Sequence, residues 1–276
     1  MENSPIVSII MPTYNRANLI SRAIKSVLNQ SFQDWELIII DDASTDNTPT
    51  ILSQWRAKNL RIKVLRNDKN NYPDISKTLN RGIKEAKGKY IARLDDDDYW
   101  CDIDKLKKQT EFLESHPDYV LCGGGVIVIN NQDKELFRYL KKEKDADIRQ
   151  RALFANPFSH TTALFLKKAV QKVGGYDNWC YAEDWGLWLK LGEIGKIYNF
   201  PEYFTCYLMA GQSKSFIHQR LQARMALQII KKHRHHYPNF WRAYCFNSTQ
   251  YFYSFLPLFI RKILHPLLSK FKRSLS

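Results

Sequence analysis

Residues 90–101 read YIARLDDDDYWC: an apolar run ends at Leu94, and four consecutive carboxylates follow it, Asp95 to Asp98. Four adjacent like charges repel one another, so a folded chain usually avoids placing them at the end of a buried segment. A bound cation would offset this repulsion. The surrounding sequence predicts the fold that would present the quartet to such a ligand.

Short apolar runs alternate with amphipathic segments through the first hundred residues. Strands are predicted at 6–11, 35–40, 62–66 and 90–94. Helices are predicted at 17–29, 48–58 and 75–86, where apolar residues recur every three to four positions. Pro12 is expected to end the first strand. This alternation predicts an α/β fold, with a parallel sheet whose two faces are covered by helices.

Polar sequences follow three of the predicted strands: PTYNR, DDASTD and DDDD. Because ligands bind open α/β sheets outside the carboxyl ends of the strands, these segments are expected to gather at one ligand-binding edge. DDAS by itself is equally typical of a solvated turn. The quartet after the fourth strand is better explained by a hard divalent ion that keeps positions open for phosphate oxygens. It therefore predicts a Mg²⁺ or Mn²⁺ site that carries a nucleotide.

A second acidic pair, Glu183 and Asp184, comes directly before a predicted helix at 185–191. Two interpretations of Asp184 stay open. As an N-cap, its carboxylate would accept hydrogen bonds from the first N–H groups of the helix. As a general base at the rim of a pocket, it would take a proton from an incoming hydroxyl group. His160, in NPFSHTTALF, is likewise either part of an acceptor-side loop or a packed, hydrogen-bonded histidine.

The pattern is less regular beyond residue 105. Further strands are predicted at 118–129, 163–166 and 197–207, and a basic helix at 214–236. Gly123 to Gly125 interrupts the first of these strands and indicates a bulge or a turn. These strands are expected to make the sheet mixed rather than wholly parallel.

Four segments in this order resemble the inverting family 2 glycosyltransferases: SIIMPTYNR, ELIIIDDASTDNT, NRGIKEAKGKYIARLDDDDYW and GGYDNWCYAEDWGLWLKL. The resemblance covers roughly residues 5–210 and implies the GT-A fold in a domain at residues 1–212. That fold is a Rossmann-like, mixed and mostly parallel sheet flanked by helices. The resemblance also implies transfer of a sugar from a nucleotide-diphosphate sugar, with a UDP-sugar favoured, to a hydroxyl group of an acceptor.

The resemblance assigns donor-binding roles to individual residues. Pro12, Tyr14 and Arg16 match the loop that packs against the base and ribose of the nucleotide. Asp42 matches the carboxylate that accepts a hydrogen bond from the base, with Asp41 beside it.

In relatives, a DxD motif binds the ribose and the metal ion that bridges the diphosphate. Here four aspartates leave the register of the motif open. Asp97 is expected as the principal ligand of Mg²⁺ or Mn²⁺, with Asp95 as a further ligand, and Asp95 or Asp96 is expected near the sugar or ribose. Asp184 matches the catalytic base, and Glu183 matches the residue that places or binds the acceptor. The expected acceptor is a glycan or a lipid-linked saccharide in surface polysaccharide or lipopolysaccharide assembly.

The positive charge of the chain is concentrated in its last quarter. Residues 1–202 carry 30 basic and 28 acidic side chains, whereas residues 203–276 carry 12 basic and no acidic ones. Apolar residues recur at helical spacing between 252 and 271, and Pro257 and Pro266 would segment such a helix. The apolar stretch before Arg261 is too short to span a bilayer, which needs about 20 residues.

We therefore expect a basic helical extension at 213–276 that lies on an anionic membrane surface. A helix docked on the body and a dimer interface are the alternatives. Nucleic acid is not expected as a partner, because no recognition motif accompanies the charge. The expected location is cytoplasmic, peripheral on the membrane: the five cysteines lack a CxxC pair, and MENSPIVSIIMP does not resemble a signal peptide.

Two other functions remain possible from the sequence alone. A nucleotidyltransferase can be built on a similar sheet, but its Gly-rich first loop is replaced here by PTYNR. A membrane-bound sensor or scaffold that binds sugar nucleotides without catalysis is the second. Products separate the three, because a nucleotidyltransferase releases pyrophosphate and a scaffold releases nothing.

Overall fold

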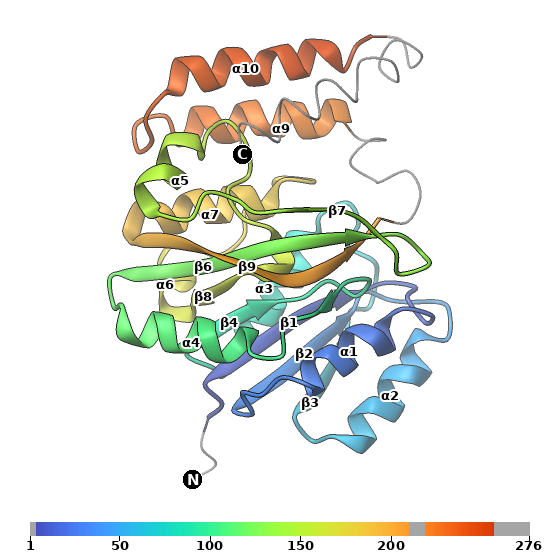
Figure 1. Cartoon of the computed structure of the whole chain (residues 1–276). Coiled ribbons are helices and arrows are strands. Elements are labelled where there is room, and N and C mark those ends of the chain that lie inside the picture. Colours follow the sequence, from blue (N-terminus) through green and yellow to red (C-terminus); the bar gives the residue numbers. More distant parts are fainter. Residues whose placement is uncertain (1–3, 210–218, 257–276) are drawn as a thin grey trace.

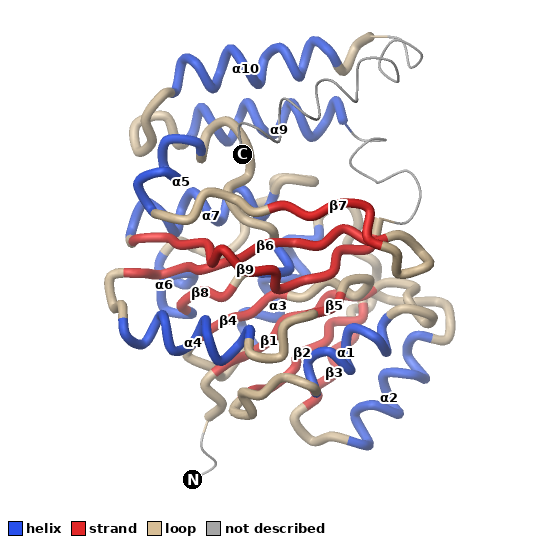
Figure 2. The backbone as a smooth tube through the Cα atoms, in the orientation of Figure 1, coloured by secondary structure: helices blue, strands red, loops and turns tan. Residues whose placement is uncertain are grey.

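The structure, a computed structural model, describes residues 4–209 and 219–256. Among these residues, a nine-stranded mixed sheet runs through the body of the protein, with helices on both faces (Figures 1 and 2). The strands are β1 (Val7–Thr13), β2 (Trp35–Asp41), β3 (Ile62–Arg66), β4 (Tyr90–Arg93), β5 (Tyr99–Trp100), β6 (Tyr119–Ile129), β7 (Glu135–Tyr139), β8 (Leu164–Leu166) and β9 (Lys196–Leu208). Their order is β3-β2-β1-β4-β8-β6-β9-β5, and β7 pairs with β6.

Most strands of the sheet share one direction. β1 pairs in parallel with β2 and β4, and β2 pairs in parallel with β3. β8 is antiparallel to both β4 and β6, so β6 runs in the direction of β4, and β9 is parallel to β6. β5 and β7 are antiparallel to their partners β9 and β6. The prediction of a mixed, mostly parallel sheet is confirmed.

The helices of the body form two layers. They are α1 (Ile20–Leu28), α2 (Thr48–Lys58), α3 (Ile75–Glu85), α4 (Lys105–Ser115), α5 (Asp145–Arg151), α6 (Lys167–Lys172) and α7 (Glu183–Ile194). Apolar side chains of α1, α2 and α4 pack on one face of the sheet. Those of α3, α6 and α7 pack on the other face. The strands between the layers are buried on both sides, which explains why their sequences are continuous apolar runs.

β1 contributes to both layers of the core. Val7, Ile9 and Met11 pack on the α1 side, whereas Ile10 packs on the α3 side, and all four side chains are buried. Successive side chains of a strand point to opposite faces of the sheet. Since full burial of one such side chain stabilises the fold by about 1.5–3 kcal/mol, this strand contributes strongly to stability.

The expectation that Pro12 ends the first strand is wrong. β1 continues to Thr13, and Pro12 pairs in register with Ile40 of β2. Its other neighbour, β4, ends at Arg93, which is opposite Ile10. The N–H that Pro12 lacks would point to the β4 side, because Ile10 uses its carbonyl oxygen there to accept from Leu94. No ladder hydrogen bond is therefore lost, and the proline is tolerated.

The predicted helices agree with the observed ones to within a few residues, with one exception that concerns the candidate site. α7 begins at Glu183, and Ala182 occupies the N-cap position without a side-chain cap. Asp184 lies inside the first turn, so the N-cap interpretation of Asp184 is wrong. The Gly123–Gly125 irregularity is confirmed, since the register between β6 and β9 shifts at these glycines.

A helical hairpin of α9 (Gln219–Lys232) and α10 (Phe240–Tyr253) covers the end of the body next to α5 and α7 (Figure 1). Ile229 and Ile230 of α9 and Ala243 of α10 share a hydrophobic cluster with Trp185 and Leu189 of α7. The boundary predicted at 212/213, the start of the helix predicted at 214–236, and most of the predicted tail helix lie outside the described residues. Within them, no helix is both long and apolar enough to cross a bilayer.

Candidate active site

The three polar segments predicted to meet at one edge of the sheet do so. Thr13 at the end of β1 is in register with Asp41 at the end of β2. β4 lies on the other side of β1 and leads directly into the aspartate quartet. Pro12 is buried in the strand, while Tyr14 is exposed and Arg16 is partly exposed.

Asn15 joins the first two segments, and the sequence analysis did not single it out. Its side-chain oxygen accepts hydrogen bonds from the N–H groups of Thr45 (2.8 Å) and Asp46 (3.3 Å). Its own N–H donates to Ser44 Oγ at 2.9 Å. The residue has φ 53°, a left-handed conformation that asparagine tolerates better than most residues. An asparagine in the loop after a strand is the signal that would have found it.

Asp41 and Asp42 are both buried and already hold the loops around them. Asp41 forms an ion pair with Arg66, and its Oδ1 accepts the N–H of Ser44 at 2.9 Å. Asp42 accepts the N–H of Asn71 at 2.9 Å through Oδ2, and the hydroxyl of Thr78 at 3.0 Å through Oδ1. These contacts fix the orientation of both carboxylates at the edge of the sheet.

The four aspartates alternate between solvent and interior. The side chains of Asp95 and Asp97 are 34% and 33% exposed. Asp96 and Asp98 are buried. Asp98 Oδ1 accepts the N–H of Leu208 at 3.0 Å, which ties the quartet to the end of β9. The fold therefore presents Asp95 and Asp97, two residues apart, to solvent.

Arg16 carries the positive charge that offsets the quartet in this structure. Its Nε lies 3.4 Å from Asp96 Oδ1, and its Nη2 lies 3.5 Å from Asp97 Oδ2. The pKa of Asp96 is nevertheless raised to about 7, by burial first and then by the charge of Asp97. The local excess of negative charge is thus only partly relieved, and a further cation would relieve it.

The oxygen donors at this corner fit Mg²⁺ or Mn²⁺. Mg²⁺ usually binds one or two carboxylates and completes its shell with water and substrate phosphates. Asp95 and Asp97 supply two partly exposed carboxylates of this kind. In residues 4–209 and 219–256, no three His, Cys, Asp or Glu side chains form a ready-made metal cage.

Glu183 and Asp184 lie partly exposed at the start of α7. Asp184 Oδ2 accepts the side-chain N–H of Asn156 at 2.6 Å, and its Oδ1 accepts the N–H of Trp185 at 2.8 Å. Burial raises the pKa of Asp184, and these two donors lower it. The pKa of Glu183 is raised to about 8, by burial first and then by Asp184. Asn156 is a further site residue that the sequence analysis missed.

The acidic pair and the quartet face a common region. The negative charge of Asp95 contributes to raising the pKa values of both Glu183 and Asp184, after burial as the main cause. Between them lies buried Arg93, whose Nη2 forms an ion pair with Asp95. Its Nε donates to His160 Nε2 at 3.0 Å, and His160 Nε2 is 2.8 Å from the hydroxyl of Tyr176.

His160 is thus a packed and hydrogen-bonded residue, one of the two interpretations that its sequence allowed. It lies in a short 3₁₀ helix, His160–Thr162. Burial, and then the charge of Arg93, lower its pKa well below the ordinary value. The ring is therefore neutral, and its Nε2 accepts a hydrogen bond from Arg93 Nε–H.

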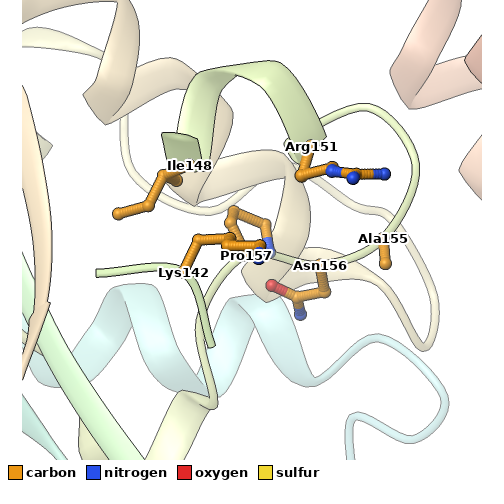
Figure 3. Close-up of a pocket in the computed structure, with 6 residues that line it drawn as sticks. All are labelled: Lys142, Ile148, Arg151, Ala155, Asn156 and Pro157. Atoms are coloured by element: carbon orange, nitrogen blue, oxygen red, sulfur yellow. The ribbon is translucent and has the colours of Figure 1, made fainter. Parts of the chain in front are cut away.

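A small pocket lies beside Asn156, the residue that donates to Asp184 (Figure 3). It is lined by Lys142, Ile148, Arg151, Ala155, Asn156 and Pro157. Its volume of about 10 Å³ is enough for roughly one water molecule. It is therefore too small for a nucleotide sugar, and it touches the candidate site only through Asn156.

The chain matches a known family in sequence. The model of Glycosyl transferase family 2 matches residues 8–174, more than half of the chain. This stretch contains PTYNR, DDASTD and the aspartate quartet, and it ends before Glu183.

Curated relatives resemble this chain over most of its length. The putative glycosyltransferase EpsE of Bacillus subtilis is 36% identical over 207 residues, covering 73% of this chain and 72% of that protein. The amylovoran biosynthesis glycosyltransferase AmsE of Erwinia amylovora is 29% identical, covering 71% and 73%. The GalNAc(5)-diNAcBac-PP-undecaprenol beta-1,3-glucosyltransferase of Campylobacter jejuni is 31% identical, covering 68% and 60%.

Solved structures share the fold at low sequence identity. The mannosyltransferase PcManGT of Pyrobaculum calidifontis, in complex with GDP-Man and Mn²⁺, has a TM-score of 0.65 at 17% identity, covering 97% of this chain and 81% of that one. TarS of S. aureus, in complex with UDP-GlcNAc, has a TM-score of 0.64 at 20% identity, covering 91% and 76%. These likenesses bear on the fold alone and agree with the GT-A architecture. The family match and the identity to EpsE together show that this chain belongs to glycosyl transferase family 2 and is a glycosyltransferase.

Proposed function

We propose that this enzyme transfers a sugar from a nucleotide-diphosphate sugar to an acceptor hydroxyl, with inversion and with a divalent metal ion. The observation that carries the proposal is the common region between the quartet and the acidic pair. Two partly exposed carboxylates, Asp95 and Asp97, lie on one side of it, and the charge of Asp95 acts on Glu183 and Asp184 on the other.

Asp97 and Asp95 would hold Mg²⁺ or Mn²⁺, with Asp97 as the principal ligand. A bound metal ion would neutralise the negative charge that grows on the leaving diphosphate. Support comes from the alternating exposure of the quartet, which leaves these two side chains open to solvent. PcManGT, a structural neighbour, was solved with Mn²⁺.

Tyr14 and Arg16 would contact the base and ribose of the donor, together with Pro12 and Asp41, and Asp42 would accept a hydrogen bond from the base. Asp96 would lie near the ribose. We favour a UDP-sugar as donor. TarS, another structural neighbour, was solved with UDP-GlcNAc, whereas PcManGT was solved with GDP-Man. A panel of nucleotide sugars tested by thermal shift with Mn²⁺ identifies the donor.

Asp184 is the proposed general base. Asn156 and the N–H of Trp185 hold its two oxygens and favour its charged form. It would take the proton of the acceptor hydroxyl as that oxygen attacks the anomeric carbon opposite the leaving diphosphate. General-base catalysis contributes roughly 10²–10⁴-fold to the rate. Attack on the face opposite to departure inverts the anomeric configuration. Glu183, neutral at pH 7, would donate a hydrogen bond to the acceptor.

The proposed acceptor is a glycan or a lipid-linked saccharide, in surface polysaccharide or lipopolysaccharide assembly at the cytosolic face of a membrane. The names of AmsE and of the Campylobacter glucosyltransferase support this class of acceptor. In this proposal residues 1–212 form the catalytic domain and residues 213–276 form an extension.

Asp184→Asn and Asp97→Ala separate catalysis from donor binding. Asp184→Asn is expected to lower kcat by roughly 10²–10⁴-fold, because an amide cannot take the proton. Its affinity for UDP with Mn²⁺, measured by calorimetry, should not change. Asp97→Ala should instead weaken UDP binding, while Asp118→Ala, at a surface ion pair with Lys196, serves as the matched control.

Two results would contradict the proposal. Unchanged UDP affinity in Asp97→Ala would contradict the assignment of Asp97 as the principal metal ligand. Release of pyrophosphate, rather than nucleoside diphosphate, on addition of acceptor would contradict the reaction.

A further inference from the structure

The outer face of α10 exposes three large aromatic rings. Exposed positions recur at helical spacing along the helix and just beyond it: Trp241, Arg242, Cys245, Thr249, Phe252, Phe255 and Leu256. The exposed fractions of Trp241, Phe252 and Phe255 are 74%, 68% and 50%. Ala243, Asn247, Tyr253 and Ser254 are the buried side chains. A usual surface helix turns a polar face to solvent, whereas this helix also exposes three large rings there.

The outer face of α9 is cationic. Its exposed positions are Arg220, Arg224, Gln228, Lys231 and Lys232, which again follow helical spacing. Residues 219–256 contain six Lys and Arg side chains and no Asp or Glu. The charge of this hairpin is therefore not balanced within the hairpin itself.

The cationic and aromatic stripes lie next to each other. α9 and α10 run antiparallel, and α10 is the outermost helix of the described chain (Figure 1). The guanidinium of Arg220 lies 4.0 Å from the ring centre of Phe255, and Lys231 Nζ lies 5.3 Å from the ring centre of Tyr244. The hairpin therefore presents a single surface that combines exposed rings with cationic groups.

We propose that the α9–α10 hairpin binds the surface of an anionic bilayer. Its aromatic side chains would enter the boundary between headgroups and acyl chains, and its cations would contact lipid phosphates. Charge complementarity favours this partner over a second copy of the chain. Two copies of this hairpin packed across a twofold axis would bring like charges together, which is unfavourable.

The hairpin also contacts the segment that leads to the acidic pair. Gln222 Nε2 donates to the carbonyl oxygen of Tyr181 at 3.2 Å, and Lys232 Nζ lies 2.7 Å from Asp177 Oδ2. Membrane binding would therefore hold the acceptor side of the site close to the lipid surface. This consequence rests on the proposed function, because it assumes a lipid-linked acceptor. Binding of the hairpin to vesicles does not depend on the proposed function.

Co-flotation of the full chain with lipid vesicles tests the proposal. We expect binding to phosphatidylcholine vesicles that contain phosphatidylglycerol, release at high salt, and no binding to pure phosphatidylcholine. Trp241→Ser with Phe252→Ser and Phe255→Ser should lower the partition coefficient at least tenfold. Arg224→Gln with Lys231→Gln should lower it by roughly tenfold or more, because each cation near anionic lipid contributes about fivefold.

Matched control variants lie on other parts of the surface. Leu60→Ser with Ile103→Ser removes two exposed apolar side chains outside the hairpin. Lys25→Gln with Lys107→Gln removes two exposed cations from α1 and α4. Both controls should float like the unaltered chain, and thermal melting verifies that every variant is folded.

Several outcomes would overturn the proposal. The first is failure of the unaltered chain to bind anionic vesicles. The second is flotation of the hairpin variants to the same extent as the unaltered chain. If flotation is lost only in the double variant Arg261→Gln with Lys262→Gln, the membrane contact lies in the tail and not in the hairpin. A dimer in light scattering that the aromatic substitutions dissociate, with flotation unchanged, would identify a second copy as the partner. Asp184→Asn should float normally, so failure of the proposed chemistry and failure of membrane binding are distinguishable.

Discussion

The guanidinium of Arg93 is buried at the end of β4, between the aspartate quartet and the acidic pair. It donates to the carbonyl oxygens of Ile10 at 2.6 Å and Leu94 at 3.0 Å, in addition to Asp95 and His160. A buried charge is tolerated only when it is paired and its hydrogen-bonding groups are satisfied. The planar fork of arginine meets this need at four acceptors, which a lysine ammonium with three donors cannot do.

Arg93→Lys is expected to lower kcat/KM by roughly 10–100-fold, because unsatisfied buried groups cost about 1–3 kcal/mol and Asp95 loses its fixed orientation. Steady-state kinetics with varied donor measures kcat and KM separately. Tyr176→Phe, which removes only the hydroxyl beside His160, should have a smaller effect. Native kcat and KM in Arg93→Lys, accompanied by a lower Tm, would assign Arg93 a purely structural role.

The raised pKa of Glu183 predicts that the stability of the folded chain depends on pH. Its pKa rises from 4.5 to about 8 on folding, so the folded chain holds this proton more tightly than the unfolded chain. The contribution of this proton to the free energy of unfolding is fully present below pH 4.5 and is lost as the pH rises through 8. Glu183→Gln stays neutral at every pH. The Tm of this variant minus that of the unaltered chain should therefore increase between pH 5 and 8 and then level off.

The size of this effect follows from linkage. One pKa unit corresponds to about 1.4 kcal/mol, and 1 kcal/mol shifts the Tm of a large domain by about 2–4 °C. Differential scanning calorimetry at several pH values measures it. Glu85→Gln, at an exposed position of α3, is the matched control for the loss of a carboxylate. A flat difference for Glu183→Gln would show that Glu183 is not held neutral.

At the scale of elements, β6 depends on its glycines. A Cβ atom at Gly124 would overlap the ring of Phe204, which is buried in the neighbouring β9. A Cβ atom at Gly125 would overlap the end of the exposed Leu140 side chain and the ring of Tyr203, which is partly exposed. The same strand therefore contains one glycine next to a fully buried ring and one next to side chains at the surface.

Gly124→Ala is expected to destabilise the protein by about 1–3 kcal/mol, because overpacking forces side chains or backbone to shift. Gly125→Ala is the matched control and should cost less, since Leu140 and Tyr203 lie at the surface and can shift toward solvent. Urea unfolding followed by circular dichroism measures both. Equal stability losses in the two variants would show that the contact with Phe204 does not determine the cost.

At the scale of the whole molecule, α7 joins the catalytic body to the hairpin. Its first turn carries the acidic pair, and its middle contacts Tyr237, in the turn between α9 and α10. The hydroxyl of Tyr237 donates to the carbonyl oxygen of Leu189 at 2.7 Å. Gly192 leaves the space for this hydroxyl, because a Cβ atom there would overlap it.

Gly192→Ala should therefore loosen the hairpin, with a loss of about 1–3 kcal/mol from overpacking. Limited proteolysis should cut the turn at 233–239 faster in this variant. Adding Tyr237→Phe removes the overlapping oxygen and should restore part of the lost stability, as a double-mutant cycle would show. If the double variant is no more stable than Gly192→Ala, the contact with Tyr237 is not the cause.

The sequence by itself determined the strands β1 to β4, β6, β8 and β9, the helices α1 to α3 and α7, and the edge at which the polar segments meet. These follow from local periodicity and from the rule that ligands bind at the carboxyl ends of parallel strands. The sequence did not indicate β5, β7, α4, α5, α6 or the bounds of α10. Pro12 was misplaced because its tolerance depends on the length of β4, which lies about eighty residues away along the chain. The N-cap interpretation of Asp184 failed because the helix begins one residue before it.

Only the tertiary structure decided which aspartates of the quartet face solvent and what neutralises them. Arg16 and Arg93 act on the quartet through space, and His160, Tyr176 and Asn156 reach the site from distant parts of the chain. It also decided that Trp241, Phe252 and Phe255 face outward while Tyr253 is buried. The physical reason is that periodicity and propensity are local properties, whereas burial and charge pairing depend on which segments the folded chain brings together.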